Sequence, residues 1–215
     1  IYDDKGKTVD LNFNVNPGSR VHVSQVLITG NDSTDDTVIR RELRQMDGSW
    51  LSSEAIEVSK TRLNRTGYFE TVDVTTENVG ATDDTVSVNT KVKERPTGSI
   101  SGGIGIGTDS GLTIQASISQ NNLFGWGTRA NITSYENDYR KHMEIGYTDP
   151  YFTVDNVSLG GRLYLDKYDG DDDEDVVDYT NHTCGATFNL GYPISETWFV
   201  NYNLGIEKSK IKNNG

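Results

Sequence analysis

The sequence predicts two parts of different class: an α+β domain of order β-α-α-β-β, followed by about seven antiparallel strands of a transmembrane β-barrel, which form a partial barrel. Three observations predict this division. Apolar residues recur at helical spacing only in the first half of the chain. From Gly98 onward they alternate with polar residues in segments of about ten residues. The connections between those segments are alternately polar and aromatic, which places the two kinds at opposite ends of an antiparallel sheet.

The composition excludes several classes of protein. Of the 215 residues, 33% are hydrophobic, and no window approaches 18 consecutive apolar residues, so the sequence contains no membrane-spanning helix. A membrane-spanning barrel is compatible with this composition, because its strands expose only alternate residues to lipid. The net charge of −12 argues against a nucleic-acid partner. The single Cys184 cannot form an internal disulfide.

The first residues predict the final strand of a preceding domain, over residues 1–17. Apolar residues alternate with Asp and Asn from Val9 to Val15, and the turn Asn16-Pro17-Gly18 follows. The start of the chain looks trimmed, because Ile1 opens almost at once onto this strand and no signal peptide precedes it.

The α+β domain is expected over residues 20–95. A strand over 21–28 stops at Gly30, and Ser33 or Thr34 caps a helix that continues to Gly48. Ser52 or Ser53 caps a second helix, which ends at a left-handed Gly67. Two strands complete the domain, around residues 72–74 and over residues 86–92.

The barrel part is expected over residues 98–215, and its first strand, Gly98 to Gly107, is unusual. Ile100, Ile104 and Ile106 share one face, whereas the other face holds only Ser and Gly. Each interior glycine costs roughly 0.5–1 kcal/mol in chain entropy and gives nothing to pack. The pattern predicts a strand that pairs weakly; the alternative is a strand thinned by glycine so that another element can pack close. No helix follows, so these glycines do not form a dinucleotide-binding loop.

Six further strands follow, each with one apolar and one polar face. They are expected around residues 112–119, 129–135, 142–147, 157–165, 183–190 and 198–207.

The connections between these strands distinguish a membrane barrel from a soluble sandwich. The polar connections are residues 108–110, 136–138 and 166–178, and the others are rich in aromatic or apolar residues. A sandwich has no reason to sort its turns in this way, whereas a barrel places aromatic residues at the headgroup layer. The expected membrane-interface aromatics are Phe124, Trp126, Tyr151, Phe152, Tyr192 and Trp198.

The connection 166–178 carries eight acids against one lysine, Lys167. Its core from Asp169 to Asp175 lacks the central glycine and the spaced glutamate of a known calcium loop, so a solvated extracellular loop is favoured over a calcium site. His22, His142 and His182 lie in different elements, and Ser195 is in no nucleophile motif, so no catalytic group, metal site or cofactor is predicted.

Several motifs closely resemble the BamA family, outer-membrane insertases of Gram-negative bacteria. They are Arg40 to Gly48, Arg62 to Val72, Val92 to Arg95 before a glycine-rich strand, Asp149 to Asn156, and Ser158 to Leu163. The resemblance covers essentially the whole chain. It implies that residues 1–17 end the fourth POTRA repeat, that 20–95 are the fifth, and that 98–215 open a sixteen-stranded barrel.

The resemblance also implies a function without catalysis or a cofactor: insertion of nascent β-barrel proteins into the outer membrane, with the POTRA part in the periplasm. The edge expected to pair with substrate strands is Ser99, Ile100, Ser101, Gly102, Gly103, Ile104, Gly105 and Ile106. Arg40, Arg44 and Asp47 are expected to contact a periplasmic lipoprotein subunit through ion pairs. Asp47 stands where relatives often have Glu, which shortens its reach by one methylene. A solvated helix surface is the alternative for these three residues.

Two other classes of function stay open on sequence grounds. A two-partner secretion transporter, or another passive pore, would also combine POTRA modules with a barrel. An outer-membrane hydrolase would need a catalytic set of serine, histidine and acid that lies outside this sequence.

Overall fold

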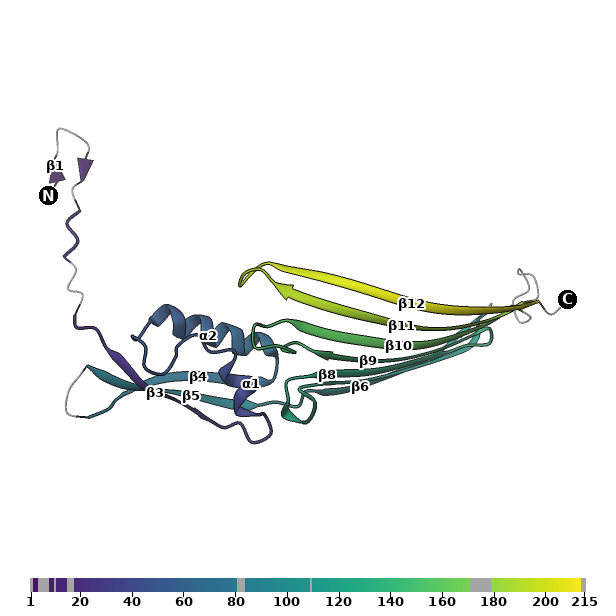
Figure 1. Cartoon of the computed structure of the whole chain (residues 1–215), viewed down its shortest axis with the longest axis horizontal. Helices are drawn as coiled ribbons and strands as arrows, with labels where there is room; N and C mark the ends of the chain where they lie inside the picture. Colours follow the sequence, from purple (N-terminus) through teal and green to yellow (C-terminus); the bar gives the residue numbers. More distant parts are fainter. Residues whose placement is uncertain are drawn as a thin grey trace.

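A computed structural model describes residues 2–3, 8–9, 11–14, 18–80, 84–108, 110–170 and 179–213. Figure 1 shows an elongated molecule, with the α+β domain at one end and a long sheet that extends away from it. Among the described residues, no helix has the length and hydropathy needed to cross a membrane.

The α+β domain has the predicted order. It consists of β3 (His22–Thr29), α1 (Asp36–Arg40), α2 (Ser53–Thr66), β4 (Phe69–Asn78) and β5 (Thr85–Glu94). The sheet order is β3-β5-β4, with β5 parallel to β3 and antiparallel to β4. Both helices contribute to one buried cluster against this sheet, in which Ile39, Leu63 and Val88 are almost fully buried. Removal of this apolar surface from water is the main stabilising contribution to the domain.

The first helix differs from its prediction. It begins after Asp35 rather than at a Ser33 or Thr34 cap, and it ends at Arg40 rather than near Gly48. The reason is tertiary, because the chain after α1 turns back to β3: the Gly48 amide donates to the Val23 carbonyl at 2.9 Å, and Asp47 accepts from the Val26 amide. The apolar residues after Arg40 keep helical spacing, but the backbone there does not make helical hydrogen bonds.

The second helix is as predicted, because both of its end signals are local. The Ser52 hydroxyl accepts a hydrogen bond from the Ala55 amide at 3.2 Å, which satisfies a free amide of the first turn. Gly67 ends the helix with φ +72°, a conformation that suits glycine.

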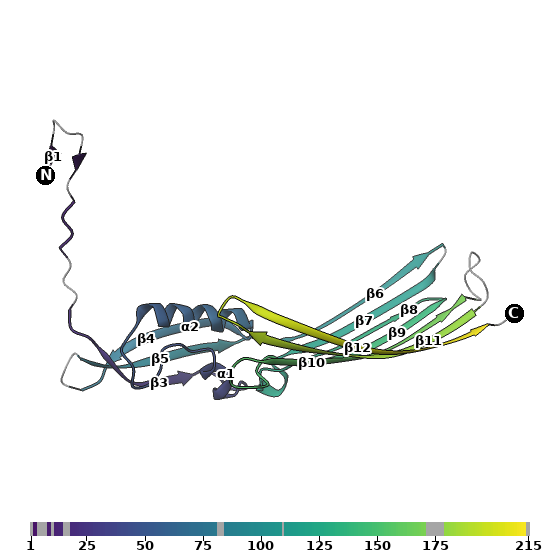
Figure 2. The same cartoon turned by 45° about the horizontal axis from the view of Figure 1, so that its top comes forward.

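The second part is a sheet of seven antiparallel strands in sequence order from β6 to β12, as predicted. Figure 2 shows β6 at one edge of this open sheet and β12 at the other. The strands are β6 (Gly98–Gly107), β7 (Gly111–Asn121), β8 (Arg129–Glu136), β9 (Arg140–Asp149), β10 (Ser158–Asp169), β11 (Tyr179–Pro193) and β12 (Phe199–Asn213).

One face of this sheet is apolar across all seven strands. Register pairs join Ile100, Ile118, Ile132, Ile145, Leu163, Ala186 and Ile206 in one continuous row. All six of the large side chains in this row are more than 40% exposed. A continuous apolar face on strands whose other face is polar is typical of a transmembrane barrel wall, so the sheet has the form of a segment of such a wall.

The predicted strand at the N-terminus is wrong in the described part. Residues 11–14 belong to no strand, and the side chains of Leu11 and Phe13 are exposed. In the described part of this region, β1 (Tyr2–Asp3) pairs with β2 (Thr8–Val9). Alternation of polar and apolar residues is insufficient for a strand when no backbone partner is present, and no described segment pairs with 11–14.

Candidate functional site

The first candidate site is the outer edge of β6. Among the described residues β6 pairs with β7 alone, in an unbroken register from Gly98 opposite Gln120 to Gly107 opposite Gly111. The side chains of Ile100, Ile104 and Ile106 are 82%, 78% and 88% exposed. All eight predicted edge residues, Ser99 to Ile106, therefore lie on one strand whose second side has no described neighbour.

Side chains hold β6 only loosely. Within the described chain, the polar face of β6 makes one hydrogen bond between side chains, which joins the hydroxyls of Ser99 and Ser119 at 2.7 Å. A Cβ added at Gly105 would meet no atom within 4 Å, and at Gly102 the nearest atom would be at an ordinary 3.5 Å. No atom of the described chain packs closely against Gly102 or Gly105, whereas a Cβ at Gly103 would lie 3.0 Å from Gln115 Nε2. The alternative of a strand thinned for packing is therefore weakened at Gly102 and Gly105 but not at Gly103.

The base of β6, in contrast, is well anchored. Three residues, 95–97, connect β5 to β6. The Arg95 amide donates to the Tyr68 carbonyl at 3.0 Å, and the Asn121 amide donates to the Thr97 carbonyl at 3.0 Å. These hydrogen bonds anchor the end of β6 next to the α+β domain. The rest of β6 is held by its hydrogen-bond ladder with β7.

The second candidate site is the junction between the α+β domain and the barrel. The turn between β7 and β8 docks on the segment before α1: Asn122 donates from Nδ2 to the Thr34 hydroxyl at 2.8 Å, and the Asp35 amide donates to the Gly125 carbonyl at 3.0 Å. Gly125 has φ +81°, and a Cβ there would lie 1.9 Å from the Ser33 carbonyl oxygen. The close approach of the two backbones requires glycine.

A cluster around Arg62 of α2 makes a second bridge across the junction. Arg62 pairs with Glu42 at 3.0 Å within its own domain, and it donates to the Tyr151 hydroxyl at 2.7 Å and to Glu196 at 2.5 Å in two barrel loops. Arg44 pairs with the same Glu196 at 2.9 Å. The Arg62 and Glu42 side chains are only 15% and 10% exposed, so breaking this contact would leave a charge with poor solvation.

The charges of this cluster shift its protonation equilibria. Burial alone would lower the pKa of Arg62, but Glu42, Tyr151 and Glu196 outweigh it and the pKa is raised. Burial likewise would raise the pKa of Glu196, yet the hydrogen bond from Arg44 and the charges of Arg62 and Arg44 lower it. Burial raises the pKa of Tyr151. All of these groups keep the charge state that the bridge needs at neutral pH.

The residues predicted to contact a lipoprotein do not form one helical face. Arg40 lies on α1 and pairs with Asp36 at 2.8 Å and with Asp47 at 3.5 Å, whereas Arg44 and Asp47 lie beyond the end of α1. Arg44 points to Glu196. Arg40 and Arg44 line a hollow of about 970 Å³ between the domain and the barrel loops, but Asp47 does not.

The predicted interface aromatics divide into two groups. Phe124, Trp126, Phe152, Tyr192 and Trp198 are exposed, at the end of the sheet that meets the α+β domain. Tyr151 differs, because its hydroxyl accepts from Arg62 and the Arg41 guanidinium lies 4.2 Å from its ring centroid. The side chain of Tyr151 belongs to the junction, which loop position alone does not reveal.

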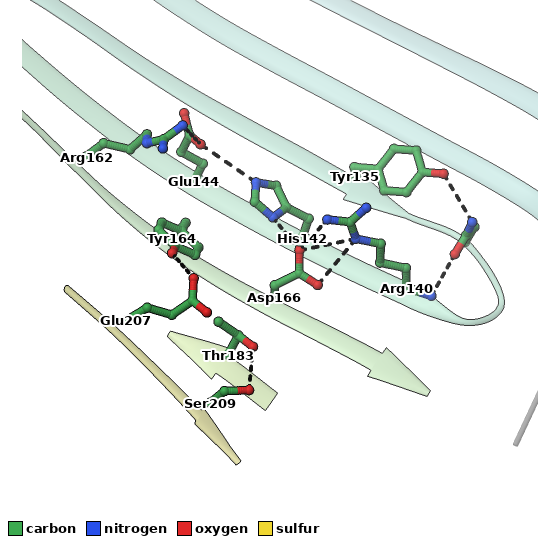
Figure 3. Close-up of polar contacts among 11 residues, drawn as sticks. Tyr135, Arg140, His142, Glu144, Arg162, Tyr164, Asp166, Thr183, Glu207 and Ser209 are labelled. Carbon is green, nitrogen blue, oxygen red and sulfur yellow. Dashed lines mark hydrogen bonds and ion pairs between the residues drawn. The ribbon is translucent and has the colours of Figure 1, made fainter. Parts of the chain in front are cut away.

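A polar network covers the other face of the sheet and was not predicted (Figure 3). Asp166 of β10 pairs with Arg140 at 2.7 Å and lies 3.0 Å from His142 Nδ1, and Arg162 pairs with Glu144 at 3.2 Å. Asp166 and Asp169 therefore lie within β10 and not in the predicted acidic loop, whose residues 171–178 are outside the described chain. Opposite charges at alternate positions of neighbouring strands were the available signal for this water-facing network.

Two family models match the chain. The repeat model described as "Surface antigen variable number repeat", or POTRA, matches residues 21–95, and the "Omp85 superfamily domain" matches residues 122–215.

Relatives and solved structures show the same pattern. The outer membrane protein assembly factor BamA of Buchnera aphidicola is 34% identical over 98% of this chain, and this chain spans 34% of that protein. A crystal structure of BamA from Haemophilus ducreyi lacking POTRA domains 1–3 is 40% identical, with a TM-score of 0.80 over 99% of this chain and 40% of that one. CdiB from Acinetobacter baumannii matches at 15% identity and a TM-score of 0.60, over 91% of this chain and 39% of that one, which is a likeness of fold alone.

Proposed function

Because this chain belongs to the Omp85 superfamily, and to its BamA-type members with a POTRA domain joined to barrel strands, we propose that it is part of the central subunit of a machine that inserts and folds β-barrel proteins. The barrel strands lie in the outer membrane and the POTRA domain lies in the periplasm. The seven strands form an open segment of the barrel. We keep residues 1–17, 20–95 and 98–215 as the proposed boundaries of the preceding repeat, the fifth POTRA domain and the barrel part.

The proposed mechanism needs no catalytic group and no nucleotide. Lipid cannot satisfy the hydrogen bonds of a free strand edge, so an exposed edge within the membrane is strongly driven to pair. A nascent strand of a substrate supplies the missing donors and acceptors by β-augmentation. Weak side-chain anchorage of β6 lets that edge separate from whatever strand otherwise covers it.

The single observation that carries this proposal is the contrast along β6. Its base is fixed by the 95–97 connection to the POTRA domain, while its outer edge from Ser99 to Ile106 has no described partner and Gly105 leaves open space. An edge that is positioned but weakly packed is suited to exchange of partners.

The contact with a periplasmic lipoprotein is proposed at the hollow between the two parts. Arg40 and Arg44 line it and Asp47 lies beside Arg40, so the three predicted residues remain the proposed contact, with Arg44 exchanging Glu196 for an acid of the partner. The remaining exposed aromatics are proposed to lie at the periplasmic membrane interface.

Site-specific crosslinking tests the role of β6. Cysteines are placed at Ser101 in β6 and, as the matched control, at its register partner Ser117 in β7, after Cys184→Ser in the complete protein. We expect an adduct with a stalled barrel substrate carrying a cysteine in its terminal strand at position 101 and none at 117, because β8 already occupies the far side of β7. Equal labelling at both positions, or none along 99–106, would remove the templating proposal.

A passive pore or a two-partner transporter is the competing function, and the shared fold with CdiB is compatible with it. Steady ion conductance through the complete protein in planar bilayers, without substrate insertion, would favour that function. The proposal is that the protein is not an enzyme, as expected of an assembly factor.

A further inference from the structure

The lipid-facing side of the sheet changes character at the end far from the POTRA domain. On β9, β10 and β12, lysines continue the apolar face toward this end, whereas β11 contributes Cys184 and His182. We name these lysines the outer lysine patch: Lys141, Lys167, Lys208, Lys210 and Lys212. Figure 1 shows that the C-terminal half of β12, which carries three of them, lies at the end opposite the POTRA domain.

The register confirms that the patch shares the apolar face. Met143, Leu165, Cys184 and Lys208 form one row directly beyond the row of Ile145, Leu163, Ala186 and Ile206. The next row outward is Lys141, Lys167, His182 and Lys210. On β9, β10 and β12 a lysine is thus the first or second outward-facing residue past the apolar band, at the depth of the headgroups.

This arrangement is unfavourable without an anion. Lys141 and Lys167 are directly opposite on neighbouring strands, where like charges destabilise a sheet. Two carboxylates of this face offset part of the charge: Glu136 pairs with Lys141 at 2.5 Å and Asp169 pairs with Lys167 at 2.7 Å.

The three lysines of β12 have no such compensation. Lys208, Lys210 and Lys212 are exposed and make no ion pair with any residue in the part of the chain that the structure describes. On the water-facing side of the same strands, in contrast, Arg140 and Arg162 are paired with Asp166 and Glu144 (Figure 3). Among the described residues of β9 to β12, the positive charge without an ion pair therefore lies on the lipid-facing side.

The patch also has a shape that suits a ligand with a charged head and an apolar body. A hollow of about 540 Å³ is lined by Lys141, Lys167, Lys208 and Lys210, by the carboxylates of Glu136 and Asp166, and by the apolar side chains of Met143 and Leu165. Lysine stems can lie along apolar surface while their ammonium groups reach the headgroup layer.

We propose that the outer lysine patch binds the phosphorylated headgroup of a lipid in the outer leaflet of the membrane. Phosphate oxygens accept charge-assisted hydrogen bonds from several ammonium groups at once, and the acyl chains continue onto Met143, Leu165 and the apolar rows below them. The apolar border of the hollow favours a lipid over a free phosphate ion. This binding requires only that the sheet spans the membrane and does not depend on pairing of substrates with β6.

Native mass spectrometry of the complete protein from detergent micelles tests the proposal, with lipid A carrying two phosphates as the probe. We expect Lys208→Gln/Lys210→Gln to weaken the binding of lipid A roughly 30-fold, because the variant removes the attraction of two interfacial lysines to the phosphates. Lys208→Arg/Lys210→Arg should retain binding because it keeps the charge. The matched control is Lys60→Gln/Lys91→Gln, which removes the same charge from the POTRA domain and should leave binding unchanged.

Heat-dependent gel mobility verifies that each variant keeps a folded barrel, and Lys141→Gln/Lys167→Gln provides a second, independent test of the patch. Unchanged binding in both glutamine variants would overturn the proposal. Equal binding of lipid A without phosphates would show that acyl chains alone are recognised, which also overturns it. Displacement of the lipid by an equal concentration of inorganic phosphate would assign the patch to a free anion instead.

Discussion

At the residue scale, the structure depends on a few contacts whose partners are far apart in sequence. Arg62 meets Tyr151 and Glu196, which lie 89 and 134 positions further along the chain. No spacing rule predicts such contacts, because they exist only after the domain and the barrel loops have met. Ser52 and Gly67 were predictable, since a helix cap and a helix stop are determined by residues within one turn.

Gly125→Ala should loosen the junction. The new Cβ would lie 1.9 Å from the Ser33 carbonyl oxygen, so the turn between β7 and β8 must withdraw from the POTRA domain. The matched control is Gly80→Ala, which has a similarly positive φ but no atom within 4 Å of the added Cβ. Both variants carry the left-handed strain of about 1–2 kcal/mol, and only Gly125→Ala adds the clash.

Distances between nitroxide labels at Lys60 of α2 and Asn203 of β12, measured by pulsed electron resonance after Cys184→Ser, give the readout. We expect a broader distance distribution in Gly125→Ala and an unchanged one in Gly80→Ala. A narrow distribution in both would contradict the assigned role of this close approach.

At the element scale, strands were predicted more reliably than the first helix. The seven barrel strands follow a two-residue period that each strand displays by itself, and short connections then pair neighbours in sequence order. The helix predicted to continue to Gly48 stops at Arg40, because residues after it bond to β3 instead. Residues 11–14 show the opposite error. Their apolar and polar residues alternate as in a strand, but no described segment pairs with them.

Gly105→Thr should strengthen β6 and slow insertion of substrates. The new side chain enters open space and lies opposite Thr113 of β7, where it replaces a glycine that costs roughly 0.5–1 kcal/mol. We expect amide exchange of β6 in the complete protein to slow roughly three- to fivefold, with a lower rate of substrate insertion in proteoliposomes.

Gly161→Ala in β10 is the control for this prediction. Its Cβ would make an ordinary contact with Phe188 at 3.7 Å, and β10 is not a neighbour of β6 in the sheet. It should leave both the exchange of β6 and the insertion rate unchanged. If amide exchange of β6 slowed in Gly105→Thr while the insertion rate stayed unaltered, weak pairing of β6 would not be needed for insertion, and the prediction would be contradicted.

At the scale of the whole molecule, the junction couples the POTRA domain to the first barrel strand. The 95–97 connection links β5 directly to β6, and two bridges, at Gly125 and at Arg62, hold the barrel loops against the same domain. A change in the orientation of the POTRA domain therefore acts on the base of β6 and on the barrel loops that contact the same domain. The sequence predicted both parts but not this coupling, since its contacts come from loops and depend on how the parts dock.

Acidification should weaken the Arg62 bridge. Contacts with Arg44 and Arg62 lower the pKa of Glu196 below its ordinary value of 4.5, so protonation is less favourable in the docked state than in the undocked one. A carboxylate with a lowered pKa stabilises the docked state fully above its ordinary pKa, and the contribution is lost as the pH falls through the lowered value. The label pair at Lys60 and Asn203 should therefore report one narrow distance from neutral pH down to the ordinary pKa of 4.5, and a broader distribution as the pH falls further. In Glu196→Gln the distance distribution should be broad at every pH. Glu70→Gln is the matched control, because Lys93 lowers the pKa of Glu70 as well, but both members of this ion pair belong to the POTRA sheet. If Glu70→Gln reproduced the broadening, the transition would belong to the POTRA domain itself and not to its docking on the barrel.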